Sequence, residues 1–336
     1  MVESAVALTE EDARAVVELA TLAPSIHNTQ PWRWRYDSAG TTDSSGTPGL
    51  HLFADPERQL SVIDPDGRQL LVSCGAALLF AKLAMRSRGL VPQVGLGPIA
   101  EAMPPRGDVP LATIRMAGHQ PPTPEETDLV AAMRRRHTDR RPFLPEGLDR
   151  ETIVALRRAA EAEQAWLLIL DRPEQRIELS VLLARADWQE THDPAYAAEL
   201  RRWTHTGTEA ASDGLTREAV AAASDTARQS EFVLRDFGVG GQPDEAGESG
   251  SAEGGAREVE RPTVVAIGTD TDGPADRLRS GEALGRVLLT ATVHGAAASP
   301  LGQVVDSPGT RDLLRRLTGG MGYLQMLLRV GRPDPA

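Results

Sequence analysis

Apolar side chains recur every three to four residues in several stretches of the chain, which is the spacing of an amphipathic helix. The first such stretch runs from Ala13 to Ala23 and follows Thr9, a residue suited to capping a helix. The stretch from Arg68 to Arg88 is apolar on nearly every side and stops at Gly89, so we expect a buried central helix with a glycine C-cap. Three further helices are expected, from Pro124 into the arginine-rich residues that Pro142 ends, from Leu148 to Ala162, and from Asp276 to Ala298.

Shorter apolar runs between polar turns predict strands at residues 32–36, 50–53, 110–116, 166–171, 263–269 and 323–330. The first two flank a polar turn at 37–49 and are expected to form a hairpin. Residues 173–235 are mostly helical in pattern, with Asp193 and Pro194 starting one helix and Thr216 another. Residues 238–256 are rich in Gly, Glu and Ser and predict a flexible connection. Helices and strands mixed in this order indicate an α+β fold.

An internal repeat divides the chain. Residues 67–94 and 281–304 both contain a long apolar helix pattern followed by a turn with Gly and Pro. Two related halves account for this repeat, and we place them at residues 1–122 and 123–336. A length of 336 residues is also that of two ordinary domains.

The charge balance narrows the possible partners. The net charge is −12 and the pI about 5.1, so nucleic acids and anionic membrane surfaces are excluded as partners. The N-terminus lacks the pattern of a signal peptide and no apolar run is long enough to span a membrane, which predicts a cytoplasmic protein. The single cysteine, Cys74, lies in the apolar helical pattern, where a buried and inert thiol is expected.

The segment APSIHNTQPW at residues 23–32 carries the most candidate chemistry. Its prolines, Pro24 and Pro31, restrict the backbone and prevent a continuous helix. A rigid segment of this kind can present fixed hydrogen-bond donors and acceptors to a flat heteroaromatic ligand at a low entropic cost. The alternative is a well-capped loop without a ligand.

These residues resemble the Pro-Ser-x-x-Asn-x-Gln-Pro-Trp motif of nitroreductase-like flavoproteins, which Pro24, Ser25, Asn28, Gln30, Pro31 and Trp32 match. A second block, RRHTDRRPF at 135–143, resembles the segment that binds the FMN phosphate in such proteins. In a standard nitroreductase the arginine block comes first, whereas here it follows about a hundred residues later. Together with DGRQLLVSCGAALL at 66–79, this order resembles the Acg family of FMN-binding oxidoreductases.

The resemblance implies a nitroreductase-like fold in which two fused half-domains form a pseudo-dimer within one chain. It further implies a helical lid insertion at about 187–260, for which a peripheral helical decoration is the alternative. A second FMN site would need an arginine block near residues 1–20 and a Pro-Ser block near 160, but these regions offer only Arg14 and the string AAEAEQAW. We therefore expect one FMN per chain, and the fused pair favours a monomer.

The resemblance also assigns the expected contacts to FMN. The first half contributes Pro24, Ser25, Asn28 and Gln30, whose amides suit the ribityl hydroxyls and the uracil-like edge of the ring. Backbone N–H groups near Leu301 and Gly302 are expected to face the flavin N5 and O4. The second half contributes the phosphate ligands, which are Arg136, His137, Thr138 and Arg140, with Arg329 or Arg332 in support.

Several residues near these motifs have simpler explanations. Arg134 to Arg136 taken alone indicate a solvated helix end, Asp139 and Arg141 are expected on a solvated face, and His137 suits packing as well as FMN binding. The string GLGPIA at 95–100 fits a dinucleotide fingerprint only formally, because the nearby prolines forbid the helix it should open. The histidine spacing gives no support for a metal site, and no side chain is expected to act as a catalytic residue.

Three functions remain open. The first is a ping-pong oxidoreductase that passes hydride from NAD(P)H through FMN to a nitroaromatic, quinone or similar electron acceptor. The second is a flavin-storage protein, not an enzyme, whose lid closes the FMN site against nicotinamide. The third is a specialised flavin-dependent step on a pathway intermediate.

Overall fold

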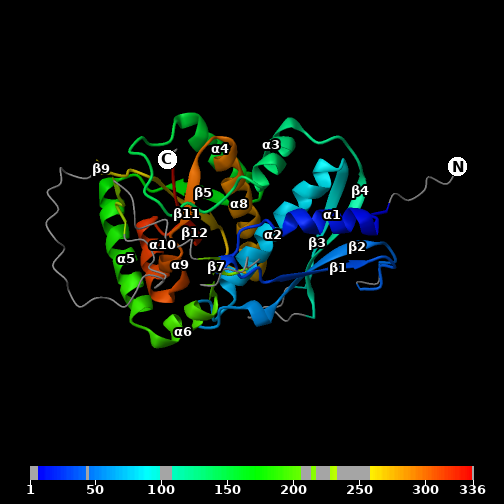
Figure 1. Ribbon diagram of the computed structural model, residues 1–336, viewed down its shortest axis with the longest axis horizontal. Helices are drawn as coiled ribbons and strands as arrows, with labels where there is room; N and C mark the ends of the chain where they lie inside the picture. Colours follow the sequence, from blue (N-terminus) through cyan, green and yellow to red (C-terminus); the bar gives the residue numbers. More distant parts are fainter. Residues whose placement is uncertain are drawn as a thin grey trace.

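Two four-stranded antiparallel sheets flank a central pair of helices, α2 (Arg68–Ser87) and α8 (Pro274–Val293) (Figure 1). The structure is a computed structural model that describes residues 7–42, 45–98, 108–205, 213–216, 228–232 and 258–334. Each central helix packs on the sheet of its own half of the chain, and the two helices pack on each other. The architecture is α+β, as the order of apolar patterns predicts.

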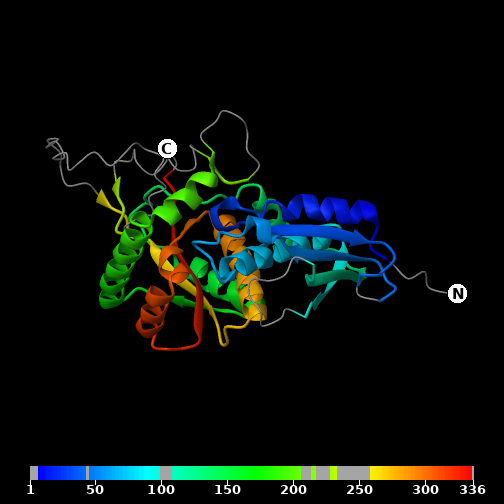
Figure 2. The same cartoon turned by 90° about the horizontal axis from the view of Figure 1, so that it is seen from below.

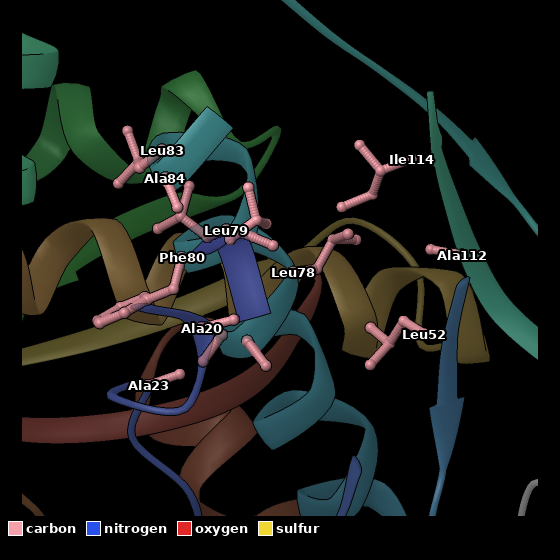
Figure 3. Packing of buried hydrophobic residues seen from close by; sticks show 14 of the residues in the cluster. Ala20, Ala23, Leu52, Leu78, Leu79, Phe80, Leu83, Ala84, Ala112 and Ile114 are labelled. Carbon is pink, nitrogen blue, oxygen red and sulfur yellow. The ribbon is translucent and has the colours of Figure 1, made fainter. Parts of the chain in front are cut away.

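The N-terminal half places α1 (Glu10–Ala20) and the strands β1 (Trp32–Asp37), β2 (Gly49–Ala54), β3 (Leu90–Leu96) and β4 (Pro110–His119) around α2, with the strand order β1-β2-β4-β3. Thr9 caps α1 by accepting a hydrogen bond from the Asp12 N–H, as expected. Figure 3 shows Leu78 of α2 lying opposite Leu52 and Ile114 of the sheet, with Ala20 close to the helix on another side. The helix is therefore covered on all sides, which explains its nearly continuous apolar sequence.

The C-terminal half repeats this topology. It contains α4 (Arg150–Ala162), β5 (Trp166–Ile169), β10 (Thr263–Thr269), α8, β11 (Ala297–Pro300) and β12 (Tyr323–Gly331). The strand order β5-β10-β12-β11 corresponds position by position to that of the first sheet, and the central helix follows the second strand in both. The chain therefore folds as two related halves, which α3 (Pro124–Met133) connects.

Two segments of the second half have no counterpart in the first. The helices α9 (Gln303–Asp306) and α10 (Pro308–Leu317) lie between β11 and β12. The longer insertion lies between β5 and β10 and contains α5 (Pro173–Thr191), α6 (Pro194–Arg202) and the two-residue strands β6 (Thr204–His205), β7 (Leu215–Thr216), β8 (Arg228–Gln229) and β9 (Glu258–Val259). Asp193 caps α6 as predicted. Thr216 lies in β7, and the residues after it, where the predicted second helix would run, lie outside the described residues. The expected flexible connection at 238–256 lies outside the described residues.

The structure corrects several predicted boundaries. The helix predicted from Asp276 to Ala298 ends at Val293, because Gly295 turns the chain with a φ of 68° and the next residues pair with β12 as β11. The helix that was expected to run to Pro142 ends at Met133, so the arginine block is not helical. Strands β3 and β11 were not predicted at all.

The central helices cross at unusually short range. A Cβ atom added to Gly75 would lie 1.9 Å from the Leu278 carbonyl oxygen, and one added to Gly281 would lie 2.0 Å from the Val72 carbonyl oxygen. Backbone touches backbone at this point, and only glycine permits it. Although α2 is long and apolar enough to span a membrane, 89% of its most apolar part is buried inside the protein, which identifies it as a core helix.

A buried ion-pair network also joins the two halves. The Lys82 ammonium group on α2 lies 2.8 Å from carboxylate oxygens of both Glu282 on α8 and Glu163, the residue that ends α4. Arg286 donates to the second oxygen of Glu163 at 2.8 Å. Burial lowers the pKa of Lys82, but Glu282 and Glu163 outweigh this effect and raise it above its usual value. The lysine thus stays charged within the interface.

We expect Gly281→Ala to lower the free energy of unfolding by about 1–3 kcal/mol, because the new methyl group overlaps the backbone of α2. Gly285→Ala is the matched control on the same helix, because its Cβ would meet a Leu79 methyl group at 3.0 Å and otherwise only make ordinary contacts at 3.5 Å or more. The change also gains helix propensity. Urea denaturation of both variants measures the difference. Equal stability of the two variants would show that the helix crossing tolerates a side chain.

Candidate functional site

The segment between α1 and β1 is held in a strained and fully specified conformation. His27, Asn28 and Gln30 have φ angles of 44°, 54° and 47°, which non-glycine residues rarely adopt. Ser25 fixes the segment from within, because its Oγ accepts a hydrogen bond from the Gln30 N–H at 3.0 Å. The Ile26 N–H donates to Ser73 Oγ on α2 at 3.1 Å. Strain of this kind persists only where the surroundings enforce it, and it concentrates at functional sites.

The long insertion lies directly on this segment (Figure 2). The Asn28 amide donates to the Gly214 carbonyl at 3.1 Å, and the Gly214 N–H donates to the Asn28 carbonyl at 2.9 Å. Arg58 joins the same contact by pairing with Asp213 at 2.7 Å and donating to the Thr29 carbonyl at 2.9 Å. Asp213 and Gly214 of the insertion are therefore bonded to the segment that contains Asn28 and Gln30, the two expected ligands of the flavin. We call this set of contacts the clamp.

The arginine block is an extended strap beside the second sheet. Thr138 forms a parallel bridge with Ala298 of β11, and the Asp139 N–H donates to the Ala298 carbonyl at 3.2 Å. The expectation that Asp139 lies on a solvated face is wrong, because this carboxyl is buried and pairs with Arg141 at 2.8 Å. These contacts fix the arginine block beside β11. Leu301 and Gly302 directly follow this strand in the sequence.

Arg329 holds the backbone of this strap in place. Its side chain is completely buried and pairs with the equally buried Glu260 at 2.7 Å. The same guanidinium donates to the carbonyl oxygens of Asp139 at 3.3 Å and Arg141 at 3.0 Å. It also lies over the Phe143 ring at 4.4 Å. These contacts make Arg329 a support for the block, whereas the sequence suggested a direct phosphate ligand.

Arg136 differs from its neighbours in having no counter-charge. Arg134 and Arg135 are exposed, as expected of a solvated helix end, but Arg136 is partly enclosed and its Nε is fully buried. Within the described part of the chain, this Nε has no hydrogen-bond acceptor and the guanidinium has no carboxylate at ion-pair distance. Burial alone lowers its pKa. A desolvated cation without a partner is suited to receive an anionic group such as phosphate.

The remaining predicted residues divide into two groups. His137 is exposed with its Nδ1 3.2 Å from the Arg135 carbonyl oxygen, and Thr138 and Arg140 are half-buried along the strap. Arg332 donates to the His294 carbonyl at 2.7 Å and to Asp149 at 2.6 Å, so it ties the chain end to α8 and α4 instead of joining the arginine block.

Leu301 also departs from the expected role. Its N–H donates to the Leu327 carbonyl at 2.8 Å, so this group already has a partner within the sheet region. Gly302 follows at the start of α9, and a Cβ added to it would lie 3.3 Å from Asp306 Oδ2. Among the two candidates for a backbone contact, the geometry thus favours Gly302. Pro24 lies half-buried just before Ser25.

Two polar residues beside this region were not singled out from the sequence. Asp64 is buried, accepts the Leu70 N–H at 2.9 Å and so caps the start of α2. Burial raises the pKa of Asp64 to about 7, and the charge of the nearby Asp306 adds to this rise. The hydrogen bonds from the backbone N–H groups act in the opposite direction and lower the pKa. Gln69 is buried on the first turn of α2, and its Nε2 has no acceptor in the described ranges. The sequence showed Gln69 only as part of the string at 66–79 and gave no signal for Asp64, which precedes that string.

Other reactive groups are absent from this region as far as the structure is described. Cys74 is buried, its Sγ donates to the Pro31 carbonyl at 3.3 Å, and burial raises its pKa well above the usual range, so the thiol is inert as predicted. Among the residues with described positions, no group of three His, Cys, Asp or Glu side chains is arranged to hold a metal ion.

Two proteins of Mycobacterium tuberculosis (strain ATCC 25618 / H37Rv) share sequence with almost the entire chain. One, provisionally named NAD(P)H nitroreductase Rv3131, is 36% identical over 332 residues, which cover 96% of this chain and 85% of that protein. The other, provisionally named NAD(P)H nitroreductase acg, is 30% identical over 336 residues, which cover 98% and 93%. No family model matches the chain.

The fold has a counterpart among solved structures. A crystal structure of a protein from Anabaena variabilis, provisionally named a nitroreductase, superposes with a TM-score of 0.51 and covers 96% of this chain and 88% of its own. Only 12% of the residues are identical, so this likeness concerns the fold alone. The nitroreductase-like fold expected from the sequence is confirmed, with both halves included in one chain.

We expect the stability of the folded protein to fall between pH 5 and pH 8 because of Asp64. Its folded-state pKa of about 7 lies above the usual 3.8, so the protonated carboxyl favours the folded state. This contribution is complete below pH 4 and disappears as the pH rises through 7, at about 1.4 kcal/mol per pKa unit. In Asp64→Asn the pH dependence should be flatter, as urea denaturation at pH 5 and pH 8 will show. Parallel loss of stability in both proteins would contradict a neutral Asp64.

Proposed function

The chain belongs to the Acg family of nitroreductase-like proteins, and from this premise we propose that it is an FMN-dependent oxidoreductase with one flavin per chain. The observation that carries the proposal is Arg136, a partly enclosed guanidinium with a buried Nε, whose surroundings in the described chain supply no negative charge. A protein tolerates such a group where a ligand provides the missing anion. The FMN phosphate provides it.

The arginine block holds the phosphate in this proposal. Arg136 and Arg140 donate charge-assisted hydrogen bonds, and the hydroxyl of Thr138 adds another. His137 is exposed beside them and is a further donor to the same group. Arg329 acts as a positioning residue, because it fixes the backbone of Asp139 and Arg141 without presenting its own charge.

The first half of the chain holds the remainder of the flavin. Pro24, Ser25, Asn28 and Gln30 contribute a backbone that is already fixed, so little ordering entropy is lost on binding. Gly302 and the Gln69 Nε2, which has no acceptor among the described residues, are the proposed contacts at the opposite edge of the site. Asp64 lies between these two sides. It caps α2 in the first half, and the charge of Asp306 in the second half raises its pKa.

Bound flavin supplies the redox chemistry, in which hydride from NAD(P)H is passed on to a nitroaromatic, quinone or similar acceptor. The chain's own residues bind and orient the cofactor and limit the access of water. The names of the relatives support a nicotinamide nucleotide as the donor. Cytoplasmic residence is part of the proposal, since it gives access to such a donor.

A storage function is the second candidate, and the position of the insertion favours it. The Asn28 amide, an expected flavin ligand, is bonded to Gly214 of the insertion, and Arg58 locks Asp213 against the same segment. A clamp that remains closed over bound flavin would retain the cofactor and exclude the nicotinamide. Turnover requires that these contacts open or leave a second entrance.

Replacing Arg136 by Ala should remove most of the flavin, with a loss of binding free energy of roughly 2–5 kcal/mol. Arg134→Ala is the matched control, because Arg134 is exposed and forms only a long 3.5 Å pair with Glu18. Flavin absorbance per chain measures the effect, and the wild type should carry one FMN. The unfolding free energy of the flavin-free Arg136→Ala protein should not decrease, since the change removes a partly enclosed cation that has no counter-charge among the described residues. Full flavin content in this variant would sink the phosphate assignment.

An anaerobic titration with NADPH and NADH separates the two functions. We expect the visible flavin absorbance to bleach with one of the nucleotides and to return on addition of a quinone or nitroaromatic. If dithionite bleaches the flavin and neither nucleotide does, the enzyme proposal is wrong and the storage function is supported.

A further inference from the structure

A cavity of about 160 Å³ lies at the start of α2, where the helix meets α10 and the first residues of β12. Its wall includes Arg68, Arg311, Arg315 and Tyr323. None of these residues belongs to the arginine block or to the segment at 24–30. The volume is enough for one small oxyanion with some hydration.

The cavity wall is positively charged in a protein whose net charge is −12. Asp272 is the main counter-charge, since it pairs with Arg68 and lies 3.5 Å from the Arg277 guanidinium. Asp312 is exposed at the wall and is the second carboxylate. The lining residues, three arginines against two aspartates, leave an excess of one positive charge. Arg277 lies outside the lining and adds to the positive charge through its pair with Asp272.

Arg68 is the built part of this site. It is 4% exposed and held by Asp272 and the Gln325 side chain, which in turn donates to Asp272 at 3.0 Å. Burial lowers the pKa of Arg68; hydrogen bonding to Asp272 opposes this effect, and the charge of Arg311 adds to the lowering. Arg277 Nε is buried and has no acceptor in the described portion of the protein. Positive charge is therefore concentrated and only partly neutralised.

Arg311 and Arg315 are presented to the cavity by the geometry of α10. They are four residues apart and so lie on the same face of the helix. Arg311 donates to the Val305 carbonyl at 3.1 Å, while Arg315 donates to the Gly322 carbonyl at 2.9 Å and lies over the Tyr323 ring at 4.3 Å. Each side chain is thus oriented by one hydrogen bond to a backbone carbonyl, and its other N–H groups remain available to a ligand.

We propose that this cavity binds a phosphate group, as the free ion or as the monoester of a small molecule. The positive charge of the lining suits an anionic group, and forked guanidinium donors suit the oxygens of a phosphate. The site is separate from the proposed FMN phosphate site and does not depend on flavin, so its failure would leave the proposed function untouched. It gives the protein a second, selective anchor for a phosphorylated ligand.

Calorimetric titration of the flavin-loaded protein with inorganic phosphate, at constant ionic strength in chloride, tests the proposal. We expect one phosphate per chain, and the same binding in Arg136→Ala, which lacks the other phosphate ligand. Arg311→Gln and Arg315→Gln should weaken binding roughly ten- to a hundredfold. Arg316→Gln, a change of an exposed arginine on the same helix, should leave it unchanged.

The outcomes separate cleanly. Equal phosphate affinity in Arg311→Gln and Arg316→Gln, or no saturable binding beyond that of chloride, overturns the proposal. Arg311→Lys guards against loss of folding, because it keeps the charge and should retain part of the affinity. Competition by 2′-AMP but not by 5′-AMP identifies the phosphate as that of an NADPH-like nucleotide, whereas competition by neither identifies free phosphate or a smaller ester.

Discussion

The contact between Gly75 and Gly281 fixes the relation of the two halves, and the candidate site depends on it. Each glycine lies in the central helix of its half, and each touches the backbone of the other helix. Any side chain there would move the helices apart and, with them, the first turn of α2. That turn begins near Asp64 and lies within electrostatic reach of Asp306 in the other half. The helix crossing therefore sets the width of the site between the halves.

The two halves share a topology but have diverged where a second site would form. The first half has eleven residues between α1 and β1, and these include the strained segment at 26–30. The second half has only three residues between α4 and β5. The first of them, Glu163, is committed to Lys82 and Arg286 in the buried network. A side chain that stabilises the interface thus lies where the second half would need a flavin-binding loop, which supports one site per chain.

The sequence predicted those elements whose signals are local. Thr9, Asp193 and the apolar pattern of α2 predicted helices correctly, because these signals operate within a few residues. The failures arise from tertiary pairing. Residues 297–300 form a strand since β12 lies beside them, and the block after Met133 is extended since Thr138 bridges to Ala298. Likewise, the motif identified Arg136 and Asn28 as candidate ligands, but neither the clamp by Gly214 nor the burial of Asp139 has any local signal.

Arg329 and Arg136, one buried and one partly enclosed, show how a structural role differs physically from the binding role that we propose. Arg329 has Glu260 as a counter-ion and two backbone carbonyls as acceptors, so its charge is neutralised by the fold itself. Arg136 lies on the strap that Arg329 supports and has no such partner among the described residues. Removing one partner of a buried ion pair lowers the free energy of unfolding, because the other charge is left without compensation. A cation that the fold leaves without a counter-charge lowers it in the same way. In the function that we propose, this local cost is relieved when the phosphate binds at Arg136. The ion pair of Arg329 and Glu260 holds the strap that carries Arg136 in place.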